Sequence, residues 1–218
     1  MEKCVIFCAA EFDKLICSLG PKDYIIAADG GLRHTQKLNL IPNEIIGDFD
    51  SLGFVPEGAN VFPVEKDDTD TMLAVRRGLN QGYRCFLIYG GLDGPRLDHT
   101  VANFQTLHFL AEQEAFGILV GNTTMAAVIK DGCICFPEGN SGTVSVFCMG
   151  VDAQGVEIEG LYYPLKNGGL SSSFPLGVSN HFTGKTAHVS VRQGTLLVLW
   201  DREAGLPCGA VVSGKKMV

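Results

Sequence analysis

Seven aspartates stand just after short apolar runs in the first half of the chain, and carboxylates in this pattern suggest metal-assisted chemistry on phosphate groups. If the apolar runs are parallel strands, their carboxyl ends share the edge at which open α/β sheets bind ligands. Carboxylates gathered there repel one another unless a hard cation lies between them, and oxygen-only ligands favour Mg²⁺. The segments AADGG, GDFDS, KDDTD and GGLDGPRLDH contain these aspartates, which are Asp29, Asp48, Asp50, Asp67, Asp68, Asp70 and Asp98.

The elements that must position these carboxylates alternate between strand-like and helix-like patterns. Helical spacing of apolar residues is visible in the segments 70–83 and 95–115, for example at Met72, Val75 and Leu79. Alternation of this kind predicts right-handed βαβ units around a largely parallel sheet, and therefore an α/β domain. The expected strands lie at about 4–9, 23–28, 44–47, 60–65, 84–90 and 116–121.

The second half of the chain has a different texture. From Thr123 onward, short β-type runs such as AAVIK, CICF, TVSVF, VEIEG, AHVSV and TLLVLW are separated by DG, GN, NGG and QG turns. No helical period interrupts them, which predicts an antiparallel sandwich or barrel. We therefore place the domain division between residues 1–121 and 122–218.

Composition narrows the class of protein. The 218 residues carry a formal net charge of −7, which argues against a nucleic-acid binder or a membrane-surface protein, because both need a basic face. The sequence contains no apolar run long enough to span a bilayer and no signal-peptide pattern, so a cytoplasmic location is expected. Eight cysteines fit this compartment, and the only close pair, Cys133 and Cys135, is expected to lie in the core rather than to bind zinc.

Each motif also has a purely structural interpretation. Asp29 in DGG suits either a turn or a polyphosphate site at a helix N-terminus, and Asp68 or Thr69 could simply cap the following helix. GDFDS is more specific, because alternate residues of an extended strand end point the same way, so that Asp48 and Asp50 can share a metal. The segment SNHFTGKT resembles a phosphate-binding P-loop, but the strand pattern TAHVSV follows it where a helix is required.

Taken in this order and at these spacings, the motifs resemble those of bacterial-type thiamine pyrophosphokinases. The resemblance rests on DGG, GDFDS, the D-x-TD element, G-G-x-x-G-x-R-x-DH and a late Ser-Asn pair, and it covers nearly the whole chain. It implies an N-terminal α/β domain, a C-terminal β-sandwich domain and a homodimer. It also implies Mg²⁺-dependent transfer of a diphosphate from ATP to the hydroxyl group of thiamine, which yields thiamine diphosphate and AMP.

The resemblance assigns roles to individual residues. Metal and ATP carboxylates fall on Asp29, Asp48, Asp50 and Asp70, and Asp98 lies in the DH element. The thiamine contact falls on Ser179 and Asn180, with His181 where a Glu often follows in the family. The further residues that we expect at the ATP site are Gly30, Lys66, Asp67, Thr69, Arg96 and His99.

This reaction agrees with the residues present. Attack by an alcohol on a phosphorus atom needs in-line positioning, charge neutralisation and a carboxylate near the hydroxyl proton, but no covalent nucleophile. We expect Asp48, Asp50 and Asp70 to hold Mg²⁺ on the triphosphate, with Lys66 and Arg96 neutralising other oxygens. The catalytic residues are therefore expected to be Asp48, Asp70 and Asp98, of which Asp70 or Asp98 would accept the proton.

Other classes fit parts of the pattern. GDFDS contains the D-x-D of aspartate-nucleophile phosphatases, although Leu52 breaks the usual continuation of that motif. A metal-dependent nucleotide-sugar transferase would use a D-x-D in a similar way. A nucleotide-sensing module is the non-enzyme alternative, but a sensor does not need so many carboxylates beside a phosphate site.

Overall fold

The computed structural model describes residues 2–49, 53–61 and 67–217, which form two compact units. The first unit consists of residues 1–106 and 119–122, and the second of residues 107–118 and 123–218. Two predicted site residues, Asp50 and Lys66, lie outside the described residues. The division that we placed between residues 121 and 122 stays a prediction.

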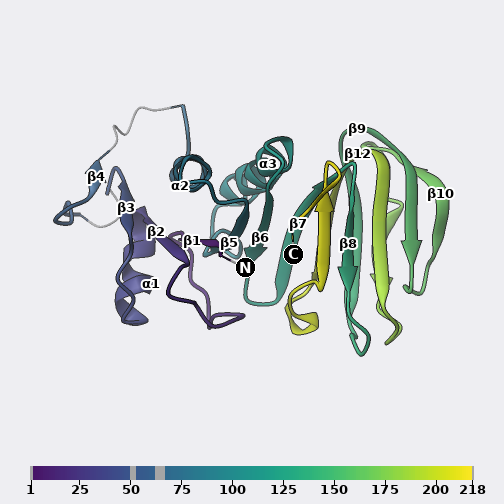
Figure 1. Cartoon of the computed structure of the whole chain (residues 1–218), viewed down its shortest axis with the longest axis horizontal. Coiled ribbons are helices and arrows are strands. Elements are labelled where there is room, and N and C mark those ends of the chain that lie inside the picture. The colour runs from purple at the N-terminus through teal and green to yellow at the C-terminus, as the bar shows by residue number, and fades with distance from the viewer. Residues whose placement is uncertain (1, 50–52, 62–66, 218) are drawn as a thin grey trace. The chain divides into compact units, whose positions relative to one another are not determined.

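A parallel sheet forms the centre of the first unit, as the sequence predicted (Figure 1). Its strand order is β5-β1-β2-β3-β4, so the chain runs outward from β1 and then returns to the other side of β1 with β5. The topological switch point therefore lies between β1 and β5, where open α/β sheets bind ligands. The strands are β1 (Cys4–Phe7), β2 (Tyr24–Ala28), β3 (Glu44–Gly47), β4 (Asn60–Val61) and β5 (Cys85–Tyr89).

Helices follow the strands where the apolar periodicity placed them. A 3₁₀ turn, η1 (Asp29–Gly31), leads into the short α1 (Leu32–Lys37), while α2 (Asp70–Asn80) and α3 (Leu97–Glu112) are longer. Helix α1 ends at Lys37, and Asn39 just beyond it adopts a positive φ of 53°, which a continuing right-handed helix does not allow. In Figure 1, α1 and α2 lie on opposite sides of the sheet, as expected for a doubly wound fold.

Aromatic packing fixes the core of the first unit beside the switch point. Strand β1 is buried along its whole length. The Phe7 ring stacks on that of Tyr89 from β5 at 5.5 Å between centroids, and on that of Phe12 at 5.8 Å. These contacts hold the carboxyl ends of β1 and β5 together, which is where the candidate site opens.

All strand pairs within the second unit are antiparallel, as predicted for this half. The long β12 (Ala187–Asp201) pairs with β7 (Thr124–Lys130) and β8 (Cys133–Phe136) on one edge and with β9 (Thr143–Glu159) on the other. The closure of these strands into a sandwich stays a prediction. The remaining elements are β6 (Phe116–Val120), which spans the unit boundary, β10 (Leu165–Leu170), β11 (Gly177–His181), η2 (Arg202–Ala204), β13 (Gly209–Val212) and β14 (Lys215–Lys216).

Two pairs of runs that the sequence suggested as separate strands are continuous. TVSVF and VEIEG both belong to β9, and AHVSV and TLLVLW both belong to β12. Gly194 interrupts β12 with a φ of 119°, where its register against β9 shifts, and the strand then continues. A glycine in a strand pattern thus marks a bulge here rather than a turn. None of the helices in the described part of the chain is long and apolar enough to cross a membrane.

Candidate active site

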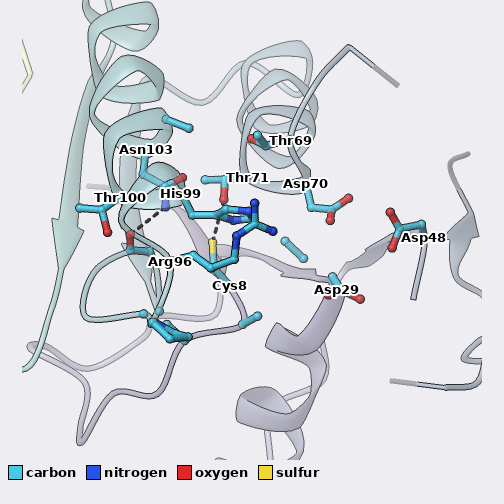
Figure 2. A pocket seen from close by; sticks show the side chains of 18 residues that line it. Cys8, Asp29, Asp48, Thr69, Asp70, Thr71, Arg96, His99, Thr100 and Asn103 are labelled. Atoms are coloured by element: carbon cyan, nitrogen blue, oxygen red, sulfur yellow. Dashed lines mark hydrogen bonds between the residues drawn. The ribbon is translucent and has the colours of Figure 1, made fainter. Parts of the chain in front are cut away.

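A pocket of about 620 Å³ opens in the first unit at the carboxyl ends of β1, β2, β3 and β5 (Figure 2). Residues that directly follow these strands line it, together with the first turns of α2 and α3. The pocket therefore occupies the switch point that the strand order defines, and its position is the one expected for a ligand site in this fold.

Small residues allow the backbones to approach one another on one side of this pocket. Cys8 to Ala10 follow β1, and Gly90 and Gly91 follow β5. Gly90 has a φ of 67°, and a Cβ there would lie 2.5 Å from the carbonyl oxygen of Ala10 and 2.6 Å from that of Cys8. Only glycine fits this position, so the glycine pair is needed to bring β5 against the end of β1.

Three of the predicted metal carboxylates, Asp29, Asp48 and Asp70, line this pocket. Figure 2 shows that they come from three different elements: η1, the segment after β3 and the first turn of α2. Asp29 is buried and adopts a positive φ of 47°. The loops after β2 and β3 pack closely, because a Cβ on Gly47 would lie only 3.1 Å from the Asp29 Cα.

The donors present match a hard cation in their chemistry, since carboxylate oxygens are the ligands that Mg²⁺ prefers. Across the described residues, no three Asp, Glu, His or Cys side chains lie in an arrangement that could hold a metal ion. Asp50, the fourth predicted ligand, falls outside this search. Mg²⁺ therefore stays a prediction that is supported by the types of residue in the pocket.

Arg96 and His99, near the start of α3, also line the pocket, whereas Asp98 does not. The Arg96 guanidinium donates to both Asp98 oxygens, with Nη2–Oδ2 at 2.6 Å and Nε–Oδ1 at 3.2 Å, and the His99 backbone N–H donates to Oδ1 at 3.0 Å. The hydrogen bonds from Arg96 lower the pKa of Asp98, with a further contribution from the His99 N–H. Asp98 is therefore a partner of Arg96 here, and a weaker base than an ordinary carboxylate.

The remaining predicted ATP residues separate into those at the pocket and those away from it. Thr69 lines the pocket and also caps α2, because its Oγ1 accepts from the Met72 N–H at 3.2 Å. Asp68 pairs with Arg76 on α2 at 2.9 Å. Neither Gly30, which is buried in η1, nor the exposed Asp67 is among the pocket-lining residues.

Four polar residues that line the pocket were not predicted from the sequence: Cys8, Thr71, Thr100 and Asn103. Cys8 lies 3.3 Å from the Thr71 hydroxyl, and burial raises the pKa of its thiol to about 12, so the thiol is neutral. Asn103, on α3, donates from Nδ2 to the carbonyl oxygen of Gly91 at 2.7 Å. Asn103 could have been predicted from the sequence, because its i, i+4 spacing from His99 places both residues on one helix face.

The predicted thiamine residues lie in the second unit, on β11, and the structure gives them different environments. Ser179 is exposed and has a φ of 58°, and its backbone N–H donates to Ser145 Oγ at 3.0 Å. Asn180 is buried and pairs with the backbone of Tyr163, donating from Nδ2 at 2.7 Å and accepting at Oδ1 at 2.9 Å. Asn180 thus positions Tyr163, which leaves Ser179 as the accessible member of the pair.

Two family models match this chain, one in each half. The family model described as "Thiamin pyrophosphokinase, catalytic domain" matches residues 18–118, and "Thiamin pyrophosphokinase, vitamin B1 binding domain" matches residues 133–196. A curated relative, the thiamine pyrophosphokinase of Bacillus subtilis strain 168, is 26% identical over 191 residues, which cover 80% of this chain and 85% of the relative.

Solved structures of similar proteins share the fold. The thiamine pyrophosphokinase structure from Bacillus subtilis has a TM-score of 0.82 at 22% identity, and covers 92% of this chain and 99% of its own. Thiamin pyrophosphokinase from Candida albicans has a TM-score of 0.72 at 16% identity, with coverage of 91% and 89%. Since the two family models together match more than half of its length, the chain belongs to the thiamin pyrophosphokinase family and is an enzyme that diphosphorylates thiamine.

Proposed function

We propose that the chain transfers the diphosphate group of ATP to the hydroxyl group of thiamine, with Mg²⁺, and that it releases AMP. The observation that carries this proposal is the convergence of Asp29, Asp48 and Asp70 on one pocket at the switch point of the parallel sheet. Three carboxylates disfavour a bare triphosphate in the same pocket, so a cation must accompany the nucleotide.

Asp29, Asp48 and Asp70, together with Asp50, would hold Mg²⁺ in this proposal. When bound, the ion supplies positive charge that neutralises the phosphate oxygens. The contribution of the chain itself is to hold Asp29, Asp48 and Asp70 on three separate elements, η1, the end of β3 and α2, so that these three carboxylates do not move as charge develops.

Asp70 is the better candidate for the group that accepts the thiamine hydroxyl proton. It lines the pocket, in the first turn of α2, while both oxygens of Asp98 already accept hydrogen bonds from Arg96. A general base needs an oxygen within reach of the reacting hydroxyl, and Asp98 is not among the pocket-lining residues. We assign Asp98 instead the task of orienting Arg96 toward the nucleotide, and keep Asp48 as a metal ligand.

Arg96, His99 and Thr69 are the pocket-lining residues that we assign to ATP. Arg96 offers a planar fork of donors that suits phosphate oxygens. Lys66 would add a second positive charge. Gly30 and Asp67 are not among the residues that line the pocket. They would contribute to ATP binding through the backbone of η1 and through the segment before α2.

We propose further that the enzyme is a homodimer whose active sites are shared between chains, with Ser179 of one chain contacting thiamine. Several large apolar side chains near Ser179 are exposed. Exposed apolar surfaces of this kind often mark the sites at which proteins associate. Tyr162 and Tyr163 are 65% and 60% exposed, with their rings edge to face at 4.8 Å. Others in this group are Phe174, Leu176 and Val178.

The cytoplasm is the proposed compartment, since all eight cysteines are free thiols.

The experiment that tests the proposal is incubation with ATP, thiamine and Mg²⁺, followed by chromatography that resolves AMP from ADP. Thiamine diphosphate and AMP should appear in equal amounts, and neither should form when the divalent metal is chelated. Formation of ADP with thiamine monophosphate would replace the proposed reaction with that of a simple kinase. Release of inorganic phosphate in the absence of thiamine would instead favour the reaction of an aspartate-nucleophile phosphatase.

A further inference from the structure

Three cysteine thiols and a histidine imidazole gather in the second unit. None of them has a role in the active site proposed above. Cys133 and Cys135 lie on β8, two residues apart and so on the same face of the strand. His188 on β12 stands directly opposite Cys135, and Cys208 comes immediately before β13, the neighbour of β8 on its other edge. The sequence predicted that Cys133 and Cys135 lie in the core, but both are only half-buried.

Cys135 and His188 are in direct contact. The Cys135 Sγ lies 3.0 Å from His188 Nδ1, so the thiol can donate to this nitrogen in the tautomer that carries its proton on Nε2. The imidazole is exposed and can exchange a proton with water. His188 is therefore placed to take the proton of Cys135 whenever the sulfur reacts.

Burial, followed by the neighbouring thiols of Cys133 and Cys208, raises the pKa of Cys135 to about 11. At neutral pH this thiol is protonated, and only the thiolate is a good nucleophile. The sulfur of Cys135 therefore needs a base in order to react. Of the two side chains hydrogen-bonded to it, Cys133 and His188, His188 is the base.

Cys208 approaches Cys135 from the other neighbouring strand. Gly209 is the register partner of Cys135, and the Cys208 N–H donates to the Cys135 carbonyl oxygen at 2.9 Å. Two residues of one strand thus face a single residue of the other, which is the arrangement of a β-bulge. Since Gly209 has no side chain, nothing on it separates the sulfur of Cys208 from that of Cys135.

The Cys133 side chain is hydrogen-bonded to that of Cys135, so Cys133 is the competing partner, and only its spacing along the strand argues against a bond between the two sulfurs. Residues two apart on a strand have Cα atoms roughly 6.6 Å apart, at the upper end of the range of about 4.4–6.8 Å that a disulfide spans. Cys133 also faces Ser190 and Val211, so neither of its direct cross-strand neighbours is a thiol.

We propose that Cys135 and Cys208 form a reversible thiol oxidation site, in which His188 serves as the base and the oxidant is a small-molecule disulfide. The exposed Cys208 attacks the disulfide first, which forms a mixed disulfide and releases one small thiol. Cys135 then passes its proton to His188 and attacks the Cys208 sulfur. The second small thiol leaves and takes up a proton, so two protein thiols are oxidised while one disulfide is reduced to two thiols.

The test uses the full-length protein, folded and fully reduced, which is incubated with excess oxidised glutathione near neutral pH and then alkylated in denaturant. We expect the free thiols to fall from eight to six per chain. The intact mass should show the loss of two hydrogen atoms, and peptide mapping should place the new bond between Cys135 and Cys208. A bond between Cys133 and Cys135, or a stable glutathione adduct without a crosslink, would overturn the proposal.

Three variants separate the roles of the side chains. Cys208→Ser should abolish the crosslink, whereas the matched control Cys133→Ser should leave it intact. His188→Gln, at an exposed position that folding should tolerate, should slow the second step at least tenfold, so that the mixed disulfide on Cys208 accumulates. A crosslink that forms in His188→Gln at the wild-type rate, or that is lost in Cys133→Ser, would contradict the assignment.

Discussion

Asn103 donates a hydrogen bond of 2.7 Å from its Nδ2 to the carbonyl oxygen of Gly91, and so ties α3 to the glycine pair that ends β5. Asn103 is buried, and both residues line the pocket. The same helix carries His99 one turn earlier, and Arg96 directly precedes it. The positions of Arg96 and His99, which we assign to ATP binding, therefore depend on the hydrogen bond between Asn103 and Gly91.

Replacing Asn103 with Ala should lower both stability and affinity for ATP. The buried Gly91 carbonyl would lose its donor, which costs about 1–3 kcal/mol, and α3 would be held less firmly. We expect KM for ATP to rise more than kcat falls, as measured by steady-state kinetics beside denaturant unfolding. Gln105→Ala, at an exposed position of the same helix, is the control, and an equal rise in its KM would contradict a specific role for the tie.

Asp48→Asn and Asp70→Asn should each reduce kcat on the order of a hundredfold or more while leaving the fold intact, because charge stabilisation dominates this kind of chemistry. The substitution keeps size and removes only an anionic oxygen. Asp98→Asn provides the comparison, since Asp98 lies outside the pocket lining and pairs with Arg96. We expect it to act mainly through KM for ATP. A loss of kcat in Asp98→Asn that exceeds the loss in Asp70→Asn would move the role of base to Asp98.

Gly31→Ala should destabilise the first unit severely. A Cβ at this position would lie 1.8 Å from the carbonyl oxygen of Phe7, and the backbone cannot yield as a flexible side chain can. The expected loss is ~3 kcal/mol or more in the free energy of unfolding, at the upper end of overpacking effects. Gly20→Ala is the control, because its Cβ would meet nothing nearer than 3.8 Å. Equal unfolding midpoints for the two variants would show that the 3₁₀ turn is not constrained as described.

The ion pair between Lys3 and Asp23 should make stability depend on pH in acid. Burial alone would raise the pKa of Asp23, but hydrogen bonds from the Lys3 ammonium and from the Gly20 and Lys3 N–H groups lower it overall. A carboxyl whose pKa is lower in the folded state stabilises the protein above its unfolded pKa of about 3.9. That stability is lost as pH falls through the folded value. Urea unfolding between pH 6 and roughly pH 2 should show a smaller decline for Asp23→Asn than for the wild type.

Mixing two inactive chains should restore activity if the active sites are shared in a homodimer. One chain carries Asp70→Asn, and the other carries Ser179→Arg, whose positive charge should repel the thiazolium ring from an exposed position. Half of the randomly mixed dimers contain one intact composite site, so about a quarter of wild-type activity should return. Recovery should follow the rate of subunit exchange. A monomer by light scattering, or no recovery after verified exchange, would place the whole site in one chain.

The parallel sheet and the location of the carboxylate pocket could be predicted from local patterns of residues alone. A buried strand is recognisable from a local apolar run, and a residue just after it must lie at the carboxyl edge of the sheet. Asp29, Asp48 and Asp70 could therefore be assigned to one pocket before their contacts were known. The cap at Thr69 was predictable for the same reason, because it depends only on the three residues that follow.

Which polar groups line the pocket and which hold the fold together is visible only in the folded chain. The pairing of Arg96 with Asp98, the contact of Asn103 with Gly91 and the contact of Asn180 with Tyr163 all depend on side-chain directions that residue types do not reveal. The last two join residues that are 12 and 17 positions apart in the chain. The meeting of Cys135 with His188 and Cys208 likewise follows from the register of three strands. Register is fixed by packing over the whole sheet, so no local pattern in the sequence could supply it.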